Sequence, residues 1–437
     1  MFKKTTLKNG LRIITISQKD TNAVTVLVLV GTGSKYEKKE ISGISHFLEH
    51  MFFKGTEKRP DKMRIAETMD KIGGTYNAFT GEDYTGYFAK VEASHFNLAL
   101  DWVSDIFLNS TLPEKEIIRE KGVIIEEINM YYDNPMSHVS LLWNKILYGD
   151  QPAGWDIAGT KESVAAIGRQ ELVNYMKNQY VSPNTIVCIA GKIDNESAIR
   201  EVKKCFSEIR TDQTKKKSKV IDASVSSALT LSGSRRAEEQ KLPSSILSFR
   251  KTDQAHLCLG VRGYNLFHPK RHTQEILGII LGGMMSSRLF MKIRERMGLA
   301  YYVKTNVDIN PDTGYLVTQA GVDNKKIEKA IIAILEEYKK AADKKIPLAE
   351  LKKAKDYTKG QMALALETSD AKASFYSLQD LLQGEILTPE GIYKKIDKIT
   401  QNDILKIAKD IFRPEKLNLA LIGPFKDKHK FQRLLRL

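Results

Sequence analysis

Apolar and polar residues follow two different periods along the first half of the chain. Residues 11–17 and 23–30 are rich in aliphatic residues and flank a polar turn, and residues 84–91 alternate between apolar and polar positions, as strands do. A helical pattern begins after Ser42-Gly43, and apolar residues recur at helical spacing in four further segments: 61–72, 93–108, 114–132 and 169–179. Strands and helices mix in blocks and not as regular βαβ units, so the pattern predicts an α+β fold.

The two halves of the chain resemble one another at a nearly constant offset. Residues 24–31 have a counterpart in residues 255–262, and Pro183 and Pro414, which precede the last strand pattern of each half, are likewise 231 residues apart. Two shorter matches lie between these, at offsets of 228 and 234: Thr85-Gly86-Tyr87 with Thr313-Gly314-Tyr315, and Leu112-Pro113 with Ile346-Pro347. Four matches in the same order indicate an internal duplication.

The duplication predicts two homologous domains, each a mostly antiparallel sheet packed with helices. We expect the first domain to span 1–210 and the second to span 244–437. Between them, residues 211–243 are rich in Lys, Ser and Ala and are predicted to be a linker.

Composition and charge narrow the class of protein. The 437 residues are 42% hydrophobic and 28% charged, which is typical of a folded protein with a sizeable core. The excess of 15 positive charges is compatible with an anionic partner. However, Lys and Arg are spread through helical patterns and no aromatic platform accompanies their densest runs. We therefore expect a solvated surface and no nucleic-acid partner.

The N-terminal segment, the apolar stretches and the cysteines indicate the cellular compartment. The N-terminal segment lacks the apolar run of an export signal, and the most apolar stretches, 23–31 and 276–285, are shorter than the roughly 20 residues that cross a bilayer. Cys188, Cys205 and Cys258 are widely spaced and odd in number, which argues against a disulfide framework. We expect a soluble, cytoplasmic protein with no membrane partner.

The first half carries a candidate metal motif, His46-Phe47-Leu48-Glu49-His50. On a helix, positions i, i+3 and i+4 share a face, so both imidazoles and the carboxylate of Glu49 project together. Two His at this spacing can hold Zn²⁺, and the Glu between them can move the proton of a water on the metal. This H-x-x-E-H order is the inverzincin signature. The alternative is a polar helix face that happens to carry these residues.

A catalytic zinc site needs a third protein ligand. Glu120 and Glu127, seven residues apart within the helical segment 114–132, lie on one side of that helix, whereas Glu126 points about 100° away from Glu127. One carboxylate can bind the metal while the other orients a histidine. Helical spacing does not decide between these roles, and a charged solvent-exposed face remains the alternative for the whole helix.

Three motifs together resemble the pitrilysin superfamily of zinc metallopeptidases. They are HFLEHMFFKGT at 46–56, GGTYNAFTGEDYTGYFAKV at 73–91 and REKGVIIEEINMYYDNP at 119–135. The chain is similar in length to the half-length members, such as the β-subunit of mitochondrial processing peptidase and its bacterial relatives. The resemblance implies that His46, His50 and Glu127, which lies 77 residues after His50, hold one zinc ion per active site. It also implies a catalytic role for Glu120, the second helix carboxylate.

The resemblance extends to substrate binding. It implies that Asn77, Ala78 and Phe79 belong to an edge strand to which a peptide substrate adds by main-chain hydrogen bonds. In the second half it implies that Arg294 binds a substrate carbonyl and that Tyr301 polarises the scissile carbonyl. From the residues alone, the alternative for the latter segment is an ordinary helix end, with Gly298 as its cap and Tyr301 opening a strand.

The second domain is predicted to have lost the metal site. Positions 231 residues beyond the motif are Leu277, Ile280 and Leu281, all apolar. The remaining histidines show no ligand spacing and are interpreted as structural or surface residues: His95, His138, His256, His268, His272 and His429.

These observations predict a zinc-dependent metalloendopeptidase of the HxxEH type that hydrolyses short or unfolded polypeptides. Water on the metal is the nucleophile and Glu49 is the general base. Full-length family members enclose a chamber between two such halves, so the resemblance implies that this chain forms a homodimer or a heterodimer with a paralogue. The alternative function is a catalytically silent core or scaffold subunit of such a heterodimer. A basic nucleic-acid-binding protein, suggested by net charge alone, is the least supported.

Overall fold

The computed structural model describes residues 2–211 and 242–437. The chain divides into two compact units, each discontinuous in sequence. Unit 1 comprises the described parts of Met1–Asn129, Trp155–Asp222 and Leu364–Leu387, and unit 2 those of Met130–Gly154, Ala223–Ala363 and Thr388–Leu437. Nearly all of the predicted linker, 211–243, lies outside the described residues.

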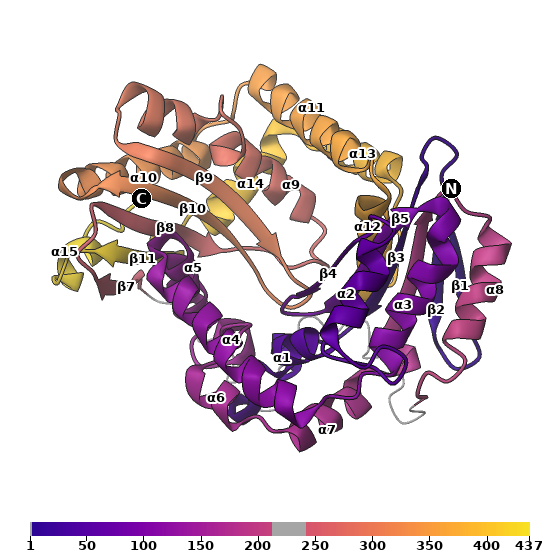
Figure 1. Ribbon diagram of the computed structural model, residues 1–437. Coiled ribbons are helices and arrows are strands. Elements are labelled where there is room, and N and C mark those ends of the chain that lie inside the picture. The colour runs from indigo at the N-terminus through magenta and orange to yellow at the C-terminus, as the bar shows by residue number, and fades with distance from the viewer. Residues whose placement is uncertain (1, 212–241) are drawn as a thin grey trace. The chain divides into compact units, whose positions relative to one another are not determined.

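Unit 1 is built on a six-stranded sheet (Figure 1). Its strand order is β1 (Phe2–Thr6), β2 (Arg12–Ser17), β6 (Thr185–Gly191), β3 (Ala23–Val30), β5 (Thr85–Glu92) and β4 (Thr75–Thr80). The β2–β6 pair is parallel and the other pairs are antiparallel. In β3, the residues from Val24 to Val30 are all buried, because helices cover both faces of this central strand.

Helices and strands share the core of unit 1. One face of the sheet packs a continuous apolar cluster with the following helices: α1 (Ile44–Met51), α2 (Lys62–Asp70), α3 (Phe96–Leu108), α4 (Glu114–Asp133), α6 (Lys161–Ala166), α7 (Arg169–Gln179) and α8 (Asn195–Cys205). Strand β4 forms the edge of the sheet and pairs with β5.

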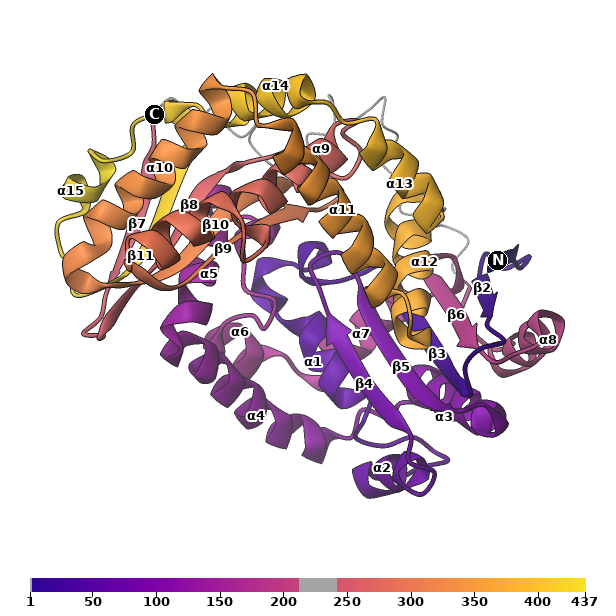
Figure 2. The ribbon, with the colours of Figure 1, turned by 90° about the horizontal axis from the view of Figure 1, so that it is seen from above.

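Unit 2 repeats this architecture with five strands. The order is β7 (Ser244–Phe249), β11 (Leu417–Gly423), β8 (Gln254–Arg262), β10 (Gly314–Asp323) and β9 (Ala300–Ile309). Its further helices are visible in Figure 2: α9 (Arg271–Gly278), α10 (Ile327–Asp343), α11 (Leu348–Ala365), α13 (Pro389–Asp397), α14 (Gln401–Ile411) and α15 (Lys428–Gln432). Two π-helical segments, Ile279–Gly283 and Phe290–Arg296, connect α9 to β9.

One helix of each repeat packs on the sheet of the other half of the sequence. Helix α5 (Pro135–Tyr148) packs Val139 and Trp143 against β8 and β11 of unit 2. Its counterpart α12 (Ser369–Gln383) covers β3 and β6 of unit 1, where the buried Asp380 carboxylate lies 3.2 Å from Nη1 of Arg12. The predicted domain boundaries, 1–210 and 244–437, place α5 in the first domain and α12 in the second, so they do not describe this exchange of helices.

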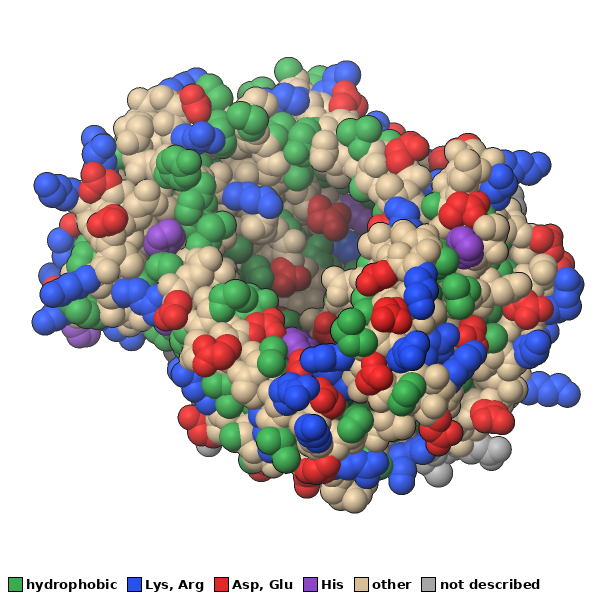
Figure 3. Space-filling model, in the orientation of Figure 1, with side chains coloured by type: hydrophobic (Ala, Val, Ile, Leu, Met, Phe, Trp, Pro, Cys, Tyr) green, Lys and Arg blue, Asp and Glu red, His purple; other side chains and the backbone are tan. Residues whose placement is uncertain are grey.

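The α+β class and the two homologous domains predicted from the sequence are confirmed. The predicted strands 11–17, 23–30 and 84–91 correspond to β2, β3 and β5, and the helix predicted after Gly43 is α1. Among the described residues, no helix is long and apolar enough to cross a membrane. On the face shown in Figure 3, Lys and Arg side chains are interspersed with Asp and Glu.

Candidate metal centre

Helix α1 presents the motif because its other face is apolar. Ile44, Phe47, Leu48 and Met51 are fully buried in the core of unit 1, at the i, i+3, i+4 and i+7 spacing of a helix face. The remaining face carries His46, Glu49 and His50. The sequence pattern of α1 therefore fixes which side chains can meet a second element.

The N-terminus of α1 is held by a buried carboxylate that sequence reasoning missed. Glu37 accepts hydrogen bonds from the backbone N–H groups of Gly43, at 2.7 Å, and Ser45, at 2.9 Å. These donors belong to the helix terminus, which has no intrahelical partners for them. Burial raises the pKa of Glu37 to about 7, although the two backbone hydrogen bonds oppose this shift. The only signal in the sequence was a Glu shortly before the predicted helix.

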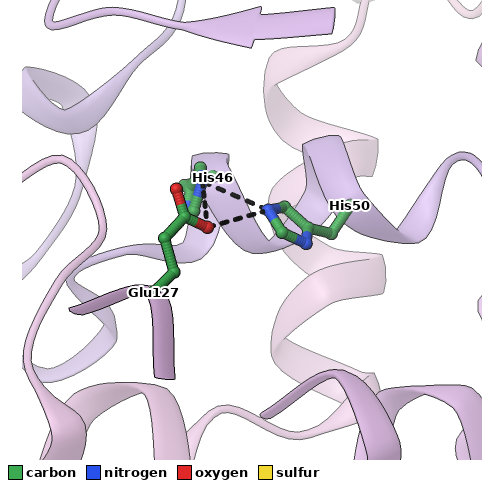
Figure 4. A group of neighbouring side chains, drawn as sticks. All are labelled: His46, His50 and Glu127. Atoms are coloured by element: carbon green, nitrogen blue, oxygen red, sulfur yellow. Dashed lines mark hydrogen bonds and ion pairs between the residues drawn. The ribbon is translucent and has the colours of Figure 1, made fainter. Parts of the chain in front are cut away.

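Helix α4 brings a carboxylate to the two imidazoles (Figure 4). The Nε2 atoms of His46 and His50 are 3.2 Å apart, and Oε2 of Glu127 lies 3.6 Å and 3.5 Å from them. Ligands bound to zinc at about 2.0–2.2 Å in a tetrahedron are separated by about 3.3–3.6 Å. The three atoms thus outline one face of such a tetrahedron, and the two imidazoles and one carboxylate suit zinc.

Glu120, on the same side of α4, lies behind His50. Its Oε1 is 2.9 Å from Nδ1 of His50, its Oε2 accepts a hydrogen bond of 2.8 Å from Nζ of Lys54, and its side chain is only 4% exposed. When the ring of His50 is neutral, a proton on Nδ1 leaves the lone pair of Nε2 directed at His46 and Glu127. Glu126 is exposed and accepts a hydrogen bond from Asn129, so it does not join this group.

The surroundings shift the pKa values of the two histidines in opposite directions. Burial lowers the pKa of His50, but the hydrogen bonds and charges of Glu120 and Glu127 outweigh burial and raise the pKa to about 9. The pKa of His46 is lowered to about 4 by burial and by the charge of His50, against the attraction of Glu127. The imidazole of His50 therefore holds a proton more strongly than the imidazole of His46.

Glu49 projects from the same face of α1 toward the end of β4. Its Oε2 accepts a hydrogen bond of 2.6 Å from Oγ1 of Thr80. Burial raises the pKa of the Glu49 carboxyl, and the Thr80 hydrogen bond opposes that shift. Thr80 is a further site residue that the sequence analysis did not single out.

The predicted substrate residues lie in two different units. Asn77, Ala78 and Phe79 belong to β4, the edge strand of unit 1, with Asn77 exposed and Ala78 buried. In unit 2, the Arg294 guanidinium lies 4.8 Å from the ring centroid of Phe290, and the Tyr301 side chain, near the start of β9, is 77% exposed. Their roles stay predictions.

The positions in unit 2 that correspond to the motif are part of its core. Leu277, Ile280 and Leu281 are fully buried. Among the described residues, the only group of His, Cys, Asp and Glu side chains arranged to hold a metal ion is His46, His50 and Glu127.

Sequence comparison identifies the family. Residues 12–161 match the family described as Insulinase (Peptidase family M16), and residues 166–357 match the Peptidase M16 inactive domain. This chain belongs to peptidase family M16. The description of the second match accords with the absence of ligand residues at Leu277, Ile280 and Leu281 of this M16 protein.

Relatives and solved structures resemble the M16 protein over nearly its full length. The "Uncharacterized zinc protease YmxG" of Bacillus subtilis is 36% identical over 97% of this chain and 98% of its own length, and an "Uncharacterized zinc protease" of Rickettsia bellii is 32% identical over 97% and 98%. A protease from Helicobacter pylori shares the fold, with a TM-score of 0.87 and 22% identity over 97% of this chain and all of that chain. Family membership and the names of these relatives support a metalloprotease that uses zinc.

Proposed function

We propose that this M16 protein is a zinc-dependent endopeptidase that hydrolyses peptide bonds of short or unfolded polypeptides. The observation that carries the proposal is the triangle of His46 Nε2, His50 Nε2 and Glu127 Oε2, with sides of 3.2, 3.5 and 3.6 Å. Glu49 lies on the same helix face, held by Thr80. A metal-binding triangle beside a carboxylate is the minimum arrangement for metal-assisted hydrolysis.

The three ligands and the neighbouring carboxylates have distinct roles in the proposal. When bound by His46, His50 and Glu127, one zinc ion per active site supplies a Lewis acid that lowers the pKa of water and polarises a carbonyl. Glu120 fixes the ring of His50 through Nδ1. Glu49 accepts a proton from the attacking water and delivers a proton to the amine nitrogen as the peptide C–N bond breaks.

Substrate binding is proposed to use the free edge of β4. Main-chain hydrogen bonds along Asn77, Ala78 and Phe79 would hold an extended peptide with little dependence on its side chains. This requires the substrate to be unfolded where it binds. Arg294 and Tyr301 are proposed to bind a substrate carbonyl and to stabilise the negative charge that develops on the scissile carbonyl oxygen.

We further propose that the half-length chain acts as a dimer, either with a second copy of itself or with a paralogue. We also propose that it acts in the cytoplasm. A closed chamber for peptides needs two such chains in the family arrangement. Solution mass, measured by light scattering together with the sedimentation velocity of the purified protein, tests this part separately.

Metal analysis combined with peptide cleavage tests the function. The purified protein should contain zinc, cleave an internally quenched unstructured peptide, lose cleavage after chelation and regain it when zinc is added back. A protein that binds zinc yet cleaves no unstructured peptide would instead be a silent scaffold subunit. A protein without metal affinity would contradict the proposal.

A further inference from the structure

A cavity of about 590 Å³ lies within unit 2, away from the predicted metal ligands in sequence. Its walls come from the loop at residues 286–288, the π-helical segment Phe290–Arg296, the end of α10 and the start of α11. Six cationic side chains line it: Arg288, Lys292, Arg296, Lys340, Lys344 and Lys345. Only two carboxylates, Glu337 and Glu350, line the same cavity.

Ion pairs fix one part of these walls. Arg288 donates to both carboxylate oxygens of Glu350, at 2.8 Å and 2.7 Å, and this bidentate contact holds the loop to the first turn of α11. Nζ of Lys292 lies 3.0 Å from Oε1 of Glu337, which also accepts a hydrogen bond of 2.9 Å from Lys340. Lys292 has a second carboxylate partner in Glu336. These three cations are balanced by three carboxylates, of which Glu336 does not line the cavity.

The other three lining cations have no partner among these carboxylates. Arg296, Lys344 and Lys345 are exposed, and no hydrogen bond or ion pair joins their side chains to another described residue. Ser287 adds a separate observation: the residue is 1% exposed, lines the cavity, and its Oγ has no hydrogen-bond partner within the described part of the chain. A buried hydroxyl without a partner is costly unless a ligand or water satisfies it.

We propose that this cavity binds a small polyphosphate, a chain of two or three linked phosphate groups. A separate phosphate group carries up to about two negative charges, and groups joined in a chain carry fewer each, so three unpaired cations are comparable in charge to two linked phosphates. Lys presents a point charge and Arg a planar fork to phosphate oxygens, and the Ser287 hydroxyl supplies a further donor. The cavity size lies within the range of small-molecule sites.

Titration calorimetry of the zinc-loaded protein at low salt tests the proposal. Pyrophosphate and tripolyphosphate are the inorganic probes, ADP and ATP test whether a nucleotide is the source of the same chemistry, and citrate is a trianion without phosphorus. We expect saturable binding of at least one phosphate probe, weakening with added salt, and at least tenfold weaker binding of citrate. Equal binding of citrate would overturn the assignment to phosphate.

Matched variants locate the binding. The triple variant Arg296→Ala, Lys344→Ala, Lys345→Ala should weaken binding at least tenfold. The control Lys325→Ala, Lys329→Ala, Lys339→Ala removes the same charge from elsewhere in unit 2 and should stay within twofold of wild type. Both triple variants retain the His46, His50 and Glu127 group, so any chelation of zinc by tripolyphosphate affects both equally.

The single charge reversal Lys344→Glu repeats the binding test with one change. Its melting temperature, measured without ligand, shows whether the variant is folded. Equal affinity of both triple variants, or no binding by wild type, would overturn the proposal.

Discussion

Oγ1 of Thr80, the last residue of β4, donates a hydrogen bond of 2.6 Å to Oε2 of Glu49 on α1. This contact joins the proposed general base to the strand that is proposed to bind substrate. It fixes one carboxylate oxygen of Glu49. Thr80 therefore acts through Glu49, as a positioning residue.

Replacing Thr80 tests this link. Thr80→Val keeps the β-branched shape that suits a strand but removes the donor, and a hydrogen bond to a charged group contributes about 1.5–3 kcal/mol. We expect kcat to fall about ten- to a hundredfold, with zinc content unchanged. Thr80→Ser retains the hydroxyl and should recover most of the activity. Equal kcat for the Val and Ser variants would show that the hydroxyl does not position Glu49.

The carboxylates of α4 should separate in their effects on metal content. Glu127→Gln, like His50→Ala, removes a ligand and should lower both zinc content and cleavage. Glu120→Gln keeps all three ligands but loses the charge that orients His50, so zinc affinity should fall about ten- to a hundredfold. Glu126→Gln is the control and should change neither quantity. Zinc loss in the Glu126 variant would contradict the geometry of the helix face.

Zinc binding should release a proton. His50 binds metal only without its Nε2 proton, and its pKa is raised from 6.5 to about 9. The raised pKa stabilises the metal-free fold fully below 6.5, and that stabilisation is lost as pH rises through 9. Calorimetry in buffers of different ionisation enthalpy should give about one proton released per zinc at about pH 7.5 and about none from His50 at about pH 10.

The control for proton release is Glu120→Gln. Loss of this carboxylate lowers the pKa of His50, so fewer protons should be released by the variant than by wild type near pH 8. Proton release that is the same at all pH values and in both proteins would contradict the raised pKa of His50.

Mixing two inactive variants tests whether Arg294 and Tyr301 act across a dimer. Glu49→Gln leaves a chain with no base, and Tyr301→Phe leaves one without the hydroxyl. If the pair of one chain serves the metal site of the other, a mixed dimer has one site with both defects and one with neither. Co-expression should then restore up to about half of the activity per mixed dimer. If dimers shown by mass to be mixed recover no activity, the shared-site proposal is contradicted. The metallopeptidase proposal is not affected by that result.

Local periodicity predicted the elements that carry the site. The apolar positions Phe47, Leu48 and Met51 give α1 its buried face, and the seven-residue interval between Glu120 and Glu127 places both on one side of α4. Which carboxylate approaches the Nε2 atoms depends on how α4 packs against α1. No pattern within α4 carries that information, and it came only from the family resemblance.

Contacts between distant segments escaped prediction for a physical reason. Thr80 lies 31 residues beyond Glu49 in another element, and a strand-terminal Thr has no pattern that marks its partner. The exchange of α5 and α12 was missed likewise. Cys188 of β6 and Cys258 of β8 occupy similar buried faces in the two sheets. Apolar faces of the same kind do not specify which of two similar helices covers them.

The most direct test of the account is Glu49→Gln, with zinc content and peptide cleavage measured on the same preparation. The amide cannot accept a proton from water, while His46, His50 and Glu127 remain unchanged. We predict zinc content equal to that of wild type and cleavage reduced at least about a hundredfold, with Glu126→Gln as the matched control at wild-type levels for both. Cleavage near the wild-type rate in zinc-loaded Glu49→Gln would contradict the proposed mechanism.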